Sequence, residues 1–321
     1  MKRTFTLLSL FLFISVLVGQ FQPQTRAELQ TAVDLWVSDN ATALTTYGEI
    51  NTWDVSLITD MSDLFKDKST FNDDISSWDV SSVTTMYQMF HNADSFNQDL
   101  SSWNVSNVTR MGSMFFTANS FNGDISNWNV SSVTTMSQMF YGTAFAGDIS
   151  NWDVSSVTNM YNMFAGANNF NGDISNWNVS SVTTFNQMFS YASAFNQDIS
   201  NWDVSSVTSM YYMFRNASIF NQDLSSWDVS NVTNMNSMFL SALAFGQDIS
   251  GWDVSSVTNM EAMFDGENSL SDGNKCAIHA SFQSNDAWPY DWSDYCGSSG
   301  CTDQYADNYD PDATIDDGSC A

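Results

Sequence analysis

The chain has 321 residues, and 43% of them are hydrophobic, which is enough apolar material for a buried core. It carries 36 acidic against 8 basic residues, and the formal net charge of −28 excludes nucleic acid and anionic lipid as partners because such a surface repels both. Only 2 histidines are present, so a serine–histidine–aspartate catalytic site has little material to draw on.

Residues 1–20 are predicted to form a signal peptide. A charged start at residues 1–3 precedes an apolar run from Leu7 to Val18, which is short for a membrane span, and the small Gly19 suits a cleavage site. No later apolar run is long enough to cross a bilayer, so no transmembrane segment is expected. The sequence thus predicts a secreted, extracellular protein, or one associated with the cell surface.

Residues 21–50 are predicted to form an N-terminal helical cap. A capping box, Thr25-Arg-Ala-Glu28, begins a helix in which apolar side chains recur at helical spacing to about Ser38. The apolar side chains are Leu29, Val33 and Trp36. Such an amphipathic helix can cover the open end of a stack of repeats.

Residues 51–270 contain nine near-identical units, each opened by a tryptophan. Successive units are 25 residues long, apart from one of 24. The tryptophans are Trp53, Trp78, Trp103, Trp128, Trp152, Trp177, Trp202, Trp227 and Trp252. A fixed period of this length predicts a stacked array of repeats, which offers partners an extended surface.

The pattern within one unit, numbered from its tryptophan, predicts both a helix and a strand. Apolar residues occupy positions 1, 3, 6, 9, 12, 13, 16, 19 and 23. Positions 6 to 16 are spaced like one face of a short helix, and positions 22 to 3 resemble a short strand. We therefore expect an α/β repeat solenoid, a leucine-rich-repeat-like stack of short strand plus short helix units with terminal caps. Methionines fill positions 9 and 12, with Leu64 and Phe185 as the exceptions, which favours a packed core column over a binding groove.

Each of the first eight units has an aspartate near its end, at position 22 of the standard unit. The column consists of Asp74, Asp99, Asp124, Asp148, Asp173, Asp198, Asp223 and Asp248. Carboxylates stacked at a strand-like spacing of about 4.8 Å repel one another, so another interaction must offset the repulsion. Each carboxylate could accept a backbone N–H in its own turn, which we favour, or the column could bind cations.

Positions 10, 11, 14 and 15 differ from unit to unit, and exposed aromatics are concentrated there. Exposed aromatic side chains are the type that anchors interfaces, although isolated surface residues are also common. We predict that these side chains contact a partner, a protein or glycan surface. The predicted residues are Tyr87, Phe116, Tyr141, Tyr161, Tyr191, Tyr211 and Tyr212, with His91 and Arg215 at equivalent positions.

Residues 271–299 are predicted to form a C-terminal cap, and residues 300–321 a disulfide-closed acidic tail module. The four cysteines are Cys276, Cys296, Cys301 and Cys320. An even number in an exported chain indicates two disulfides, and Cys276–Cys296 with Cys301–Cys320 is the preferred pairing because each closes a local segment. The other two connectivities stay open, and a zinc site is disfavoured because no C-x-x-C pair is present.

The tail gathers six aspartates within a short loop that contains glycine. They are Asp303, Asp307, Asp310, Asp312, Asp316 and Asp317. Oxygen-rich loops of this kind suit calcium, but the spacing is not that of an EF-hand. Calcium binding and a purely structural acidic turn module are therefore both open interpretations.

The unit resembles the repeat of the BspA-like family of bacterial surface proteins, a degenerate relative of leucine-rich repeats. The resemblance lies in Trp-Asp-Val-Ser-x-Val-Thr-x-Met-x-x-Met-Phe and in Phe-Asn-x-Asp-Ile-Ser before the next tryptophan, and it covers about residues 25 to 292. It implies a solenoid on exported or surface-attached proteins, many of them linked to adhesion. It implies no catalytic residues.

These observations favour a non-enzymatic binding or adhesion protein. A passive extracellular matrix or scaffold protein is the first alternative, and an extracellular glycan hydrolase is the second. The hydrolase is disfavoured because the aspartates of the array recur in every unit, whereas a catalytic carboxylate pair should be unique.

Overall fold

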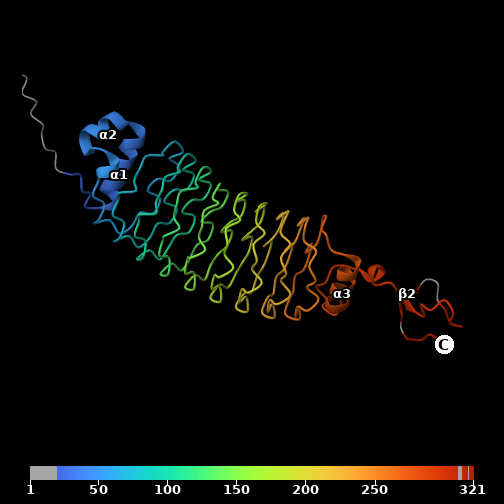
Figure 1. Cartoon of the computed structure of the whole chain (residues 1–321). Coiled ribbons are helices and arrows are strands. Elements are labelled where there is room, and N and C mark those ends of the chain that lie inside the picture. The colour runs from blue at the N-terminus through green and yellow to red at the C-terminus, as the bar shows by residue number, and fades with distance from the viewer. Residues whose placement is uncertain (1–19, 310–312, 317) are drawn as a thin grey trace, which may run out of the picture.

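The computed structural model describes residues 20–309, 313–316 and 318–321. The predicted signal peptide therefore lies outside the described residues, apart from Gln20. The units form a long stack of coils with a helical cap at each end (Figure 1). Within the described ranges, no helix is both long and apolar enough to cross a membrane.

Two helices, α1 (Arg26–Ser38) and α2 (Asn40–Tyr47), cover the first coil, and the short 3-10 helix η1 (Ile50–Thr52) leads into it. Thr25 caps α1 by accepting the backbone N–H of Glu28 at 3.2 Å. The side chains of α1 also close the exposed carbonyl edge of the first coil. Arg26 donates to the backbone oxygen of Ser62, and Gln30 donates to that of Leu64 at 3.1 Å.

The expected α/β fold of strand-plus-helix units is wrong. In the described chain the helices belong to the caps, and the coils consist of turns joined by single parallel bridges, such as Asp60 to Thr85 and Asn234 to Asn259. A helix would bond position 13 back to position 9 of its own coil. Instead, the N–H of Phe90 donates to the carbonyl of Met114 in the next coil at 2.8 Å.

Left-handed residues explain why the helix does not form. Positions 11 and 15 of every coil have positive φ, as at Gln88 and Asn92, both at 56°. A single left-handed residue ends a right-handed helix, and two of them within five consecutive residues exclude a helix there. The apolar spacing of three and four is thus satisfied by a turning ribbon rather than by a helix.

The same ribbon makes a hydrogen-bonded ladder along the stack. In the second coil, the N–H groups of Met86, Gln88, Phe90 and Asn92 all donate to carbonyls of the third coil, at 2.8 to 3.0 Å. Every N–H of the ladder points toward the C-terminal end, and every carbonyl points toward the N-terminal end. The ladder consists of main-chain groups only, so it forms whatever side chains occupy these positions.

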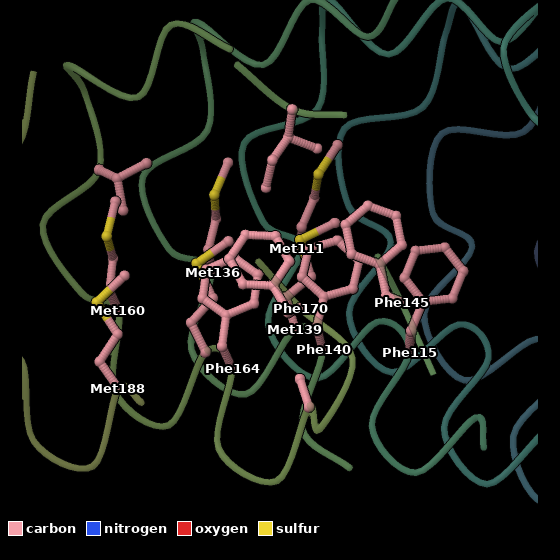
Figure 2. Close-up of a cluster of buried hydrophobic side chains, with 14 of the residues drawn as sticks. Met111, Phe115, Met136, Met139, Phe140, Phe145, Met160, Phe164, Phe170 and Met188 are labelled. Atoms are coloured by element: carbon pink, nitrogen blue, oxygen red, sulfur yellow. The ribbon is translucent and has the colours of Figure 1, made fainter. Parts of the chain in front are cut away.

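Columns of aromatic and methionine side chains fill the interior of the stack (Figure 2). Phe140 and Phe164, at position 13 of adjacent coils, stack with ring centroids 5.6 Å apart and planes at 8°. Methionines such as Met136 and Met139 are fully buried, as expected for core columns. The short unit shortens a loop without interrupting the stack, because Phe145 still lies 6.0 Å from Phe121 and 6.2 Å from Phe170.

The tryptophan column needs a ring with a donor. The indole N–H of Trp103 donates to the carbonyl of Ile75 in the coil before it at 3.1 Å, and Trp128 bonds Leu100 in the same way at 2.9 Å. Each of these carbonyls also accepts the backbone N–H of the tryptophan three residues further on, so the indole adds a second bond that connects neighbouring coils. A phenylalanine would fill the space but could not make this bond.

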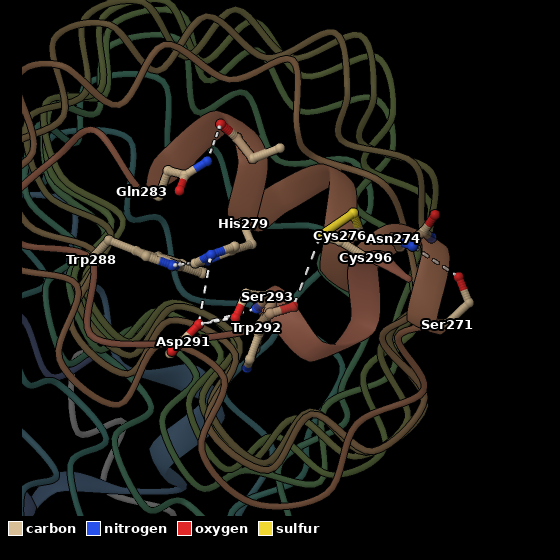
Figure 3. The surroundings of a disulfide bond; sticks show 11 residues. Ser271, Asn274, Cys276, His279, Gln283, Trp288, Asp291, Trp292, Ser293 and Cys296 are labelled. Atoms are coloured by element: carbon tan, nitrogen blue, oxygen red, sulfur yellow. Dashed lines mark hydrogen bonds and ion pairs between the residues drawn. A yellow bond between two sulfur atoms is a disulfide. The ribbon is translucent and has the colours of Figure 1, made fainter. Parts of the chain in front are cut away.

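The C-terminal cap is built around a disulfide (Figure 3). Cys276 of α3 (Asp272–Phe282) is bonded to Cys296 of the 3-10 helix η2 (Ser293–Cys296). Between them, Trp288 donates to Nδ1 of the buried His279 at 3.2 Å. The last coil ends with Phe264, whose ring packs against Trp288 and two further aromatics of the cap.

An acceptor closes the N–H edge of the last coil. The hydroxyl oxygen of Tyr290 accepts the backbone N–H of Phe264 at 2.9 Å, and the same hydroxyl donates to Asp265 at 2.8 Å. Beyond the cap, β1 (Ser298–Gly300) and β2 (Ala313–Asp316) form a two-stranded parallel pair. The second disulfide, Cys301–Cys320, closes this tail.

Candidate partner-binding face

Positions 8, 10, 11, 14 and 15 of units 2 to 8 form one continuous side of the stack outside the apolar core, which we call the variable face. It belongs to seven segments, one per coil. These are residues 85–92, 110–117, 135–142, 159–166, 184–191, 209–216 and 234–241. None of the seven contains an aspartate or a glutamate, in a chain with 36 of them.

The carboxylates return at both ends of this face and on the opposite side of the coils. Unit 1 has Asp60, Asp63 and Asp67 at the equivalent positions, and unit 9 has Glu261 and Asp265. The opposite side, formed by positions 20 to 25 and 2 to 5, repeats the same aspartate, asparagine and serine columns in coil after coil, and we call it the constant face.

The basic residues of the stack have the reverse distribution. Between residues 51 and 270 they are Lys66, Arg110 and Arg215, at positions that belong to the variable face in other units, and Lys68 at position 16. The two lysines of the first coil are paired, with Asp63 at 3.3 Å and with a carboxylate of α1 at 2.5 Å. Neither arginine forms an ion pair with a residue that the structure describes.

A first aromatic cluster spans units 2 to 4. His91, Phe116 and Tyr141 occupy position 14 of three successive coils and stack with centroids 4.6 Å apart. Burial, and then the charge of nearby Lys66, hold the pKa of His91 below its usual value of 6.5, so this ring is neutral at pH 7.

Tyr87 extends this cluster across the face. Its ring lies against Gly112 of the next coil, where an added Cβ would be in van der Waals contact with the ring at 3.4 Å. The guanidinium of Arg110 lies over the same ring, 5.5 Å from its centroid. Arginine and ring therefore hold each other in position.

A second aromatic cluster spans units 5 to 7. Tyr211 and Tyr212 are adjacent, with ring centroids 3.9 Å apart, and Arg215 lies over the rings of Tyr212 and Tyr191 at 4.6 and 5.2 Å. The hydrogen bond between the two adjacent hydroxyls raises the pKa of Tyr211 and lowers that of Tyr212. Tyr161 belongs to the same side, and its hydroxyl accepts from a glutamine of the next coil at 3.4 Å.

Two tyrosines of this cluster occupy left-handed backbone positions. Tyr191 has φ 59° and Tyr212 has φ 57°. Bulky residues are uncommon there because the conformation is unfavourable by about 1–2 kcal/mol for residues with a side chain. Other coils place smaller or more flexible residues at these two positions, such as Gly166 and Ser113, and tyrosine is the one aromatic residue type found there. Residues held against a local preference are concentrated at functional sites.

The structure brings together on this face all seven aromatics that the sequence singled out. It also places Arg110 there, a residue that the sequence analysis did not select because position 8 was not among the variable positions. The available signal was its charge, since no other unit has a basic residue at position 8.

The aspartate column of the constant face serves the turns. The carboxylate of Asp99 accepts the backbone N–H of Ser101 at 2.8 Å, and every other member of the column makes the equivalent bond two residues on. This hydrogen bond lowers the pKa of Asp99, and the charge of Asp74 in the adjacent coil opposes the shift more weakly. The turn bonds therefore outweigh the repulsion between neighbouring coils.

The predicted calcium residues of the tail lie only partly within the described structure. Asp310, Asp312 and Asp317 lie outside it, and so does the side chain of Asp316. The carboxylate of Asp303 accepts the N–H of Tyr305 at 2.9 Å, as in an ordinary turn. Among the described residues no three metal-binding side chains converge, so calcium binding by the tail stays a prediction.

Comparison with known proteins places the repeats in a family. The model described as "Mycoplasma protein of unknown function, DUF285" matches four overlapping stretches, residues 36–146, 123–218, 143–248 and 182–277. The chain belongs to this family. The match establishes a repeat family of this kind without singling out the BspA-like leucine-rich-repeat proteins. No curated protein and no solved structure matches the chain.

Proposed function

We propose that the protein is a non-enzymatic binding protein of the cell exterior that presents the variable face to a partner. The observation that carries the proposal is the difference between the two sides of the same coils. One side repeats its acidic pattern from coil to coil. The other changes from coil to coil, excludes carboxylates, and gathers the aromatics and both unpaired arginines.

The composition of the variable face supports a recognition role. Asparagine, tyrosine and serine are its commonest residues, and the same residues are enriched in the binding loops of antibodies. Tyrosine gives a large contact area at little conformational entropy, while serine and asparagine adapt their hydrogen bonds. The resemblance to BspA-like surface proteins supports adhesion as the purpose of the contact.

Two further features support an extracellular, non-enzymatic role. Both disulfides fit an oxidising compartment, in which such bonds form and persist. A glycan hydrolase needs one carboxyl group whose pKa is raised so that it can donate a proton. The resolved shifts of aspartate pKa in the stack are all downward, and hydrogen bonds from the following serine are their main cause.

The test exchanges residues between coils on each face. The face variant is Tyr191→Asn, Tyr211→Asn and Tyr212→Ser, which takes residues that other coils already hold at those positions. The matched control is Asp153→Asn and Asp203→Asn on the constant face, where other coils hold asparagine. Both variants and the wild type are applied to arrays of immobilised glycans and extracellular matrix proteins.

We expect the wild type and the control to be retained by the same array members, and the face variant to bind at least tenfold more weakly. Hot-spot tyrosines have effects of this size. Equal retention of all three proteins would favour the passive scaffold and refute the proposed role of this face.

A further inference from the structure

Both arginines of the variable face are held in place by tyrosine rings, without a hydrogen bond or an ion pair from the guanidinium to any described residue. Arg110 and Arg215 each lie over tyrosine rings, and neither guanidinium donates a hydrogen bond or forms an ion pair within the described structure. The Nε of Arg215 is buried with no hydrogen-bond partner. A guanidinium in a chain with 36 acidic residues would ordinarily find a carboxylate. The coils around these two provide none.

We propose that the variable face binds a polysaccharide chain that is mainly neutral and carries occasional carboxylate or sulfate groups, which pair with Arg110 and Arg215. This inference rests on the proposed function and names the partner class of the same face. A guanidinium is suited to this role because its planar N–H groups match the oxygens of a carboxylate or sulfate in pairs.

The spacing of the two arginines requires a chain as ligand. Arg110 belongs to unit 3 and Arg215 to unit 7, so they lie four coils apart. At a strand-like spacing of about 4.8 Å per coil, the separation along the stack is roughly 19 Å. A single sugar cannot reach both arginines, whereas an extended polymer can.

The surface between the arginines suits neutral sugars. It presents the amides of Gln138, Asn159 and Asn186, whose oxygens accept hydrogen bonds within the stack and whose N–H groups can donate to sugar hydroxyls. One anion for each arginine, with uncharged contacts between them, corresponds to a polymer of low charge density. A densely charged polyanion would be repelled by the net charge of −28, as nucleic acid would be.

A protein partner fits this face less well. Protein interfaces are organised around large apolar side chains that become fully buried. In the described structure Tyr191, at 48% exposure, is the one member of the variable face among the exposed large hydrophobic side chains. The remaining aromatics are half-buried against neighbouring coils, so they offer ring edges and hydroxyls rather than an apolar centre.

The experiment uses matched polymers and matched variants of the full chain. The probes are partly methyl-esterified galacturonan, glucuronoxylan, hyaluronan and a sparsely sulfated galactan. Each is compared with its neutral counterpart, obtained by reducing the carboxylates or removing the sulfates. The variant is Arg110→Gln with Arg215→Gln. The control is Lys275→Gln, because Lys275 also lies over a tyrosine ring, 4.3 Å from its centroid, but belongs to the C-terminal cap.

We expect the wild type and the control to bind at least one charged probe, and to bind its neutral counterpart about tenfold more weakly, as expected for loss of charge-assisted hydrogen bonds. The double variant should bind the charged probe at least tenfold more weakly while its thermal midpoint is unchanged. Full esterification of the galacturonan should weaken binding because it removes the carboxylates that pair with the arginines. Complete removal of its esters should also weaken binding at low salt, because a densely charged polyanion is repelled by the acidic protein.

Three results would overturn the inference. The first is binding of no charged probe more tightly than its neutral form. The second is unchanged binding by the double variant. The third is binding of polyglutamate as tightly as the best polysaccharide, which would point to an acidic protein segment. Loss of matrix-protein binding in the tyrosine face variant, without polysaccharide binding by the wild type, would leave the proposed function standing and refute this inference alone.

Discussion

The constant and variable faces belong to the same coils, yet neighbouring coils are connected differently on each. On the constant face, side chains make the connections. The amide oxygen of Asn97 accepts the backbone N–H of Asn122 at 2.7 Å, and the hydroxyl of Ser102 donates to the carbonyl of Ser76 at 2.6 Å. On the variable face, a ladder of backbone groups connects each coil to the next, and side chains add bonds at some coils only, as from the hydroxyl of Ser209 to the amide oxygen of Asn186 at 2.6 Å.

This difference explains which positions can change. A side chain that bonds the next coil at every step cannot be replaced without losing a hydrogen bond between coils, so its identity repeats. Beside a main-chain ladder the coils stay connected without side chains, so the side chains there are free to vary. Freedom to vary does not explain why carboxylates are excluded from seven coils of so acidic a chain, and that exclusion is the part that indicates a partner.

The largest expected effect comes from the core that both faces share. Phe164 is fully buried, and its ring lies 3.9 Å from that of Phe170 and 5.8 Å from that of Phe189. We expect Phe164→Ala to lower the free energy of unfolding by about 3–5 kcal/mol, because it leaves a cavity within stacked rings. Urea denaturation measures this value. Tyr161→Asn, a change on the variable face of the same coil, should lower it by less than about 1 kcal/mol. Equal losses would contradict the division between core and variable face.

A smaller loss is expected on the constant face. The side-chain oxygen of Asn196 accepts from the backbone of Asn221 at 2.9 Å and from the side chain of Gln222 at 2.8 Å. Asn196→Ala should lower the free energy of unfolding by about 0.5–1.5 kcal/mol, since hydrogen bonds between coils are lost at a partly exposed site. The comparison is Ser137→Ala on the variable face, where the hydroxyl bonds no described residue, and a change within about 0.5 kcal/mol is expected. Equal losses in the two variants would contradict the assignment of this stabilisation to the hydrogen bonds of Asn196.

Much of the interior could be predicted from the sequence, and the local structure could not. The tryptophan, phenylalanine and methionine columns follow from the period alone, because residues at the same position of each unit meet in a stack. The helix was inferred from the spacing of positions 6 to 16, but apolar spacing records only which residues face inward. It does not record the sign of φ.

The signal against a helix lay at position 15. Gly142, Gly166 and Gly266 occur there, and Asn92 and Asn216 occupy the same position in other coils. Glycine and asparagine are the residues that adopt left-handed conformations most readily, so their recurrence at one position predicts a turn. The aromatic side of the candidate site was predictable because variation between units is visible in the sequence. The pairing of arginines with tyrosine rings was not, because two of the three contacts, Arg110 with Tyr87 and Arg215 with Tyr191, join residues of different coils.

The third prediction is a mutation that does not lower the free energy of unfolding, whereas most mutations do. Tyr191 has a left-handed conformation that Asn92 and Asn216 adopt at the same position with φ of 56° and 55°. Tyr191→Asn should therefore leave the free energy of unfolding unchanged or raise it by up to about 1 kcal/mol, because asparagine tolerates this conformation better. Thermal unfolding measures this change, and array binding in parallel should weaken. A loss of more than about 1 kcal/mol would show that the tyrosine stabilises the fold, and the argument for a recognition role would lose that support.

The smallest effect concerns acid. Hydrogen bonds from Ser155 and Ser205 lower the pKa of Asp153 and Asp203, respectively, below the usual value of 3.8. A carboxyl group whose pKa is lower in the folded state stabilises that state above its unfolded pKa, and the contribution is lost as the pH falls through the folded value. Asp153→Asn with Asp203→Asn keeps the turn, as Asn129 and Asn178 do, but removes the titration. The difference in urea midpoint between the double variant and the wild type should therefore be larger near pH 7 than near pH 3, where the wild-type carboxylates are partly protonated. The same difference at both pH values would show that these two aspartates act through their shape alone. Their charge would then have no role in stabilising the stack, whereas the absence of carboxylates on the variable face would still need a partner to explain it.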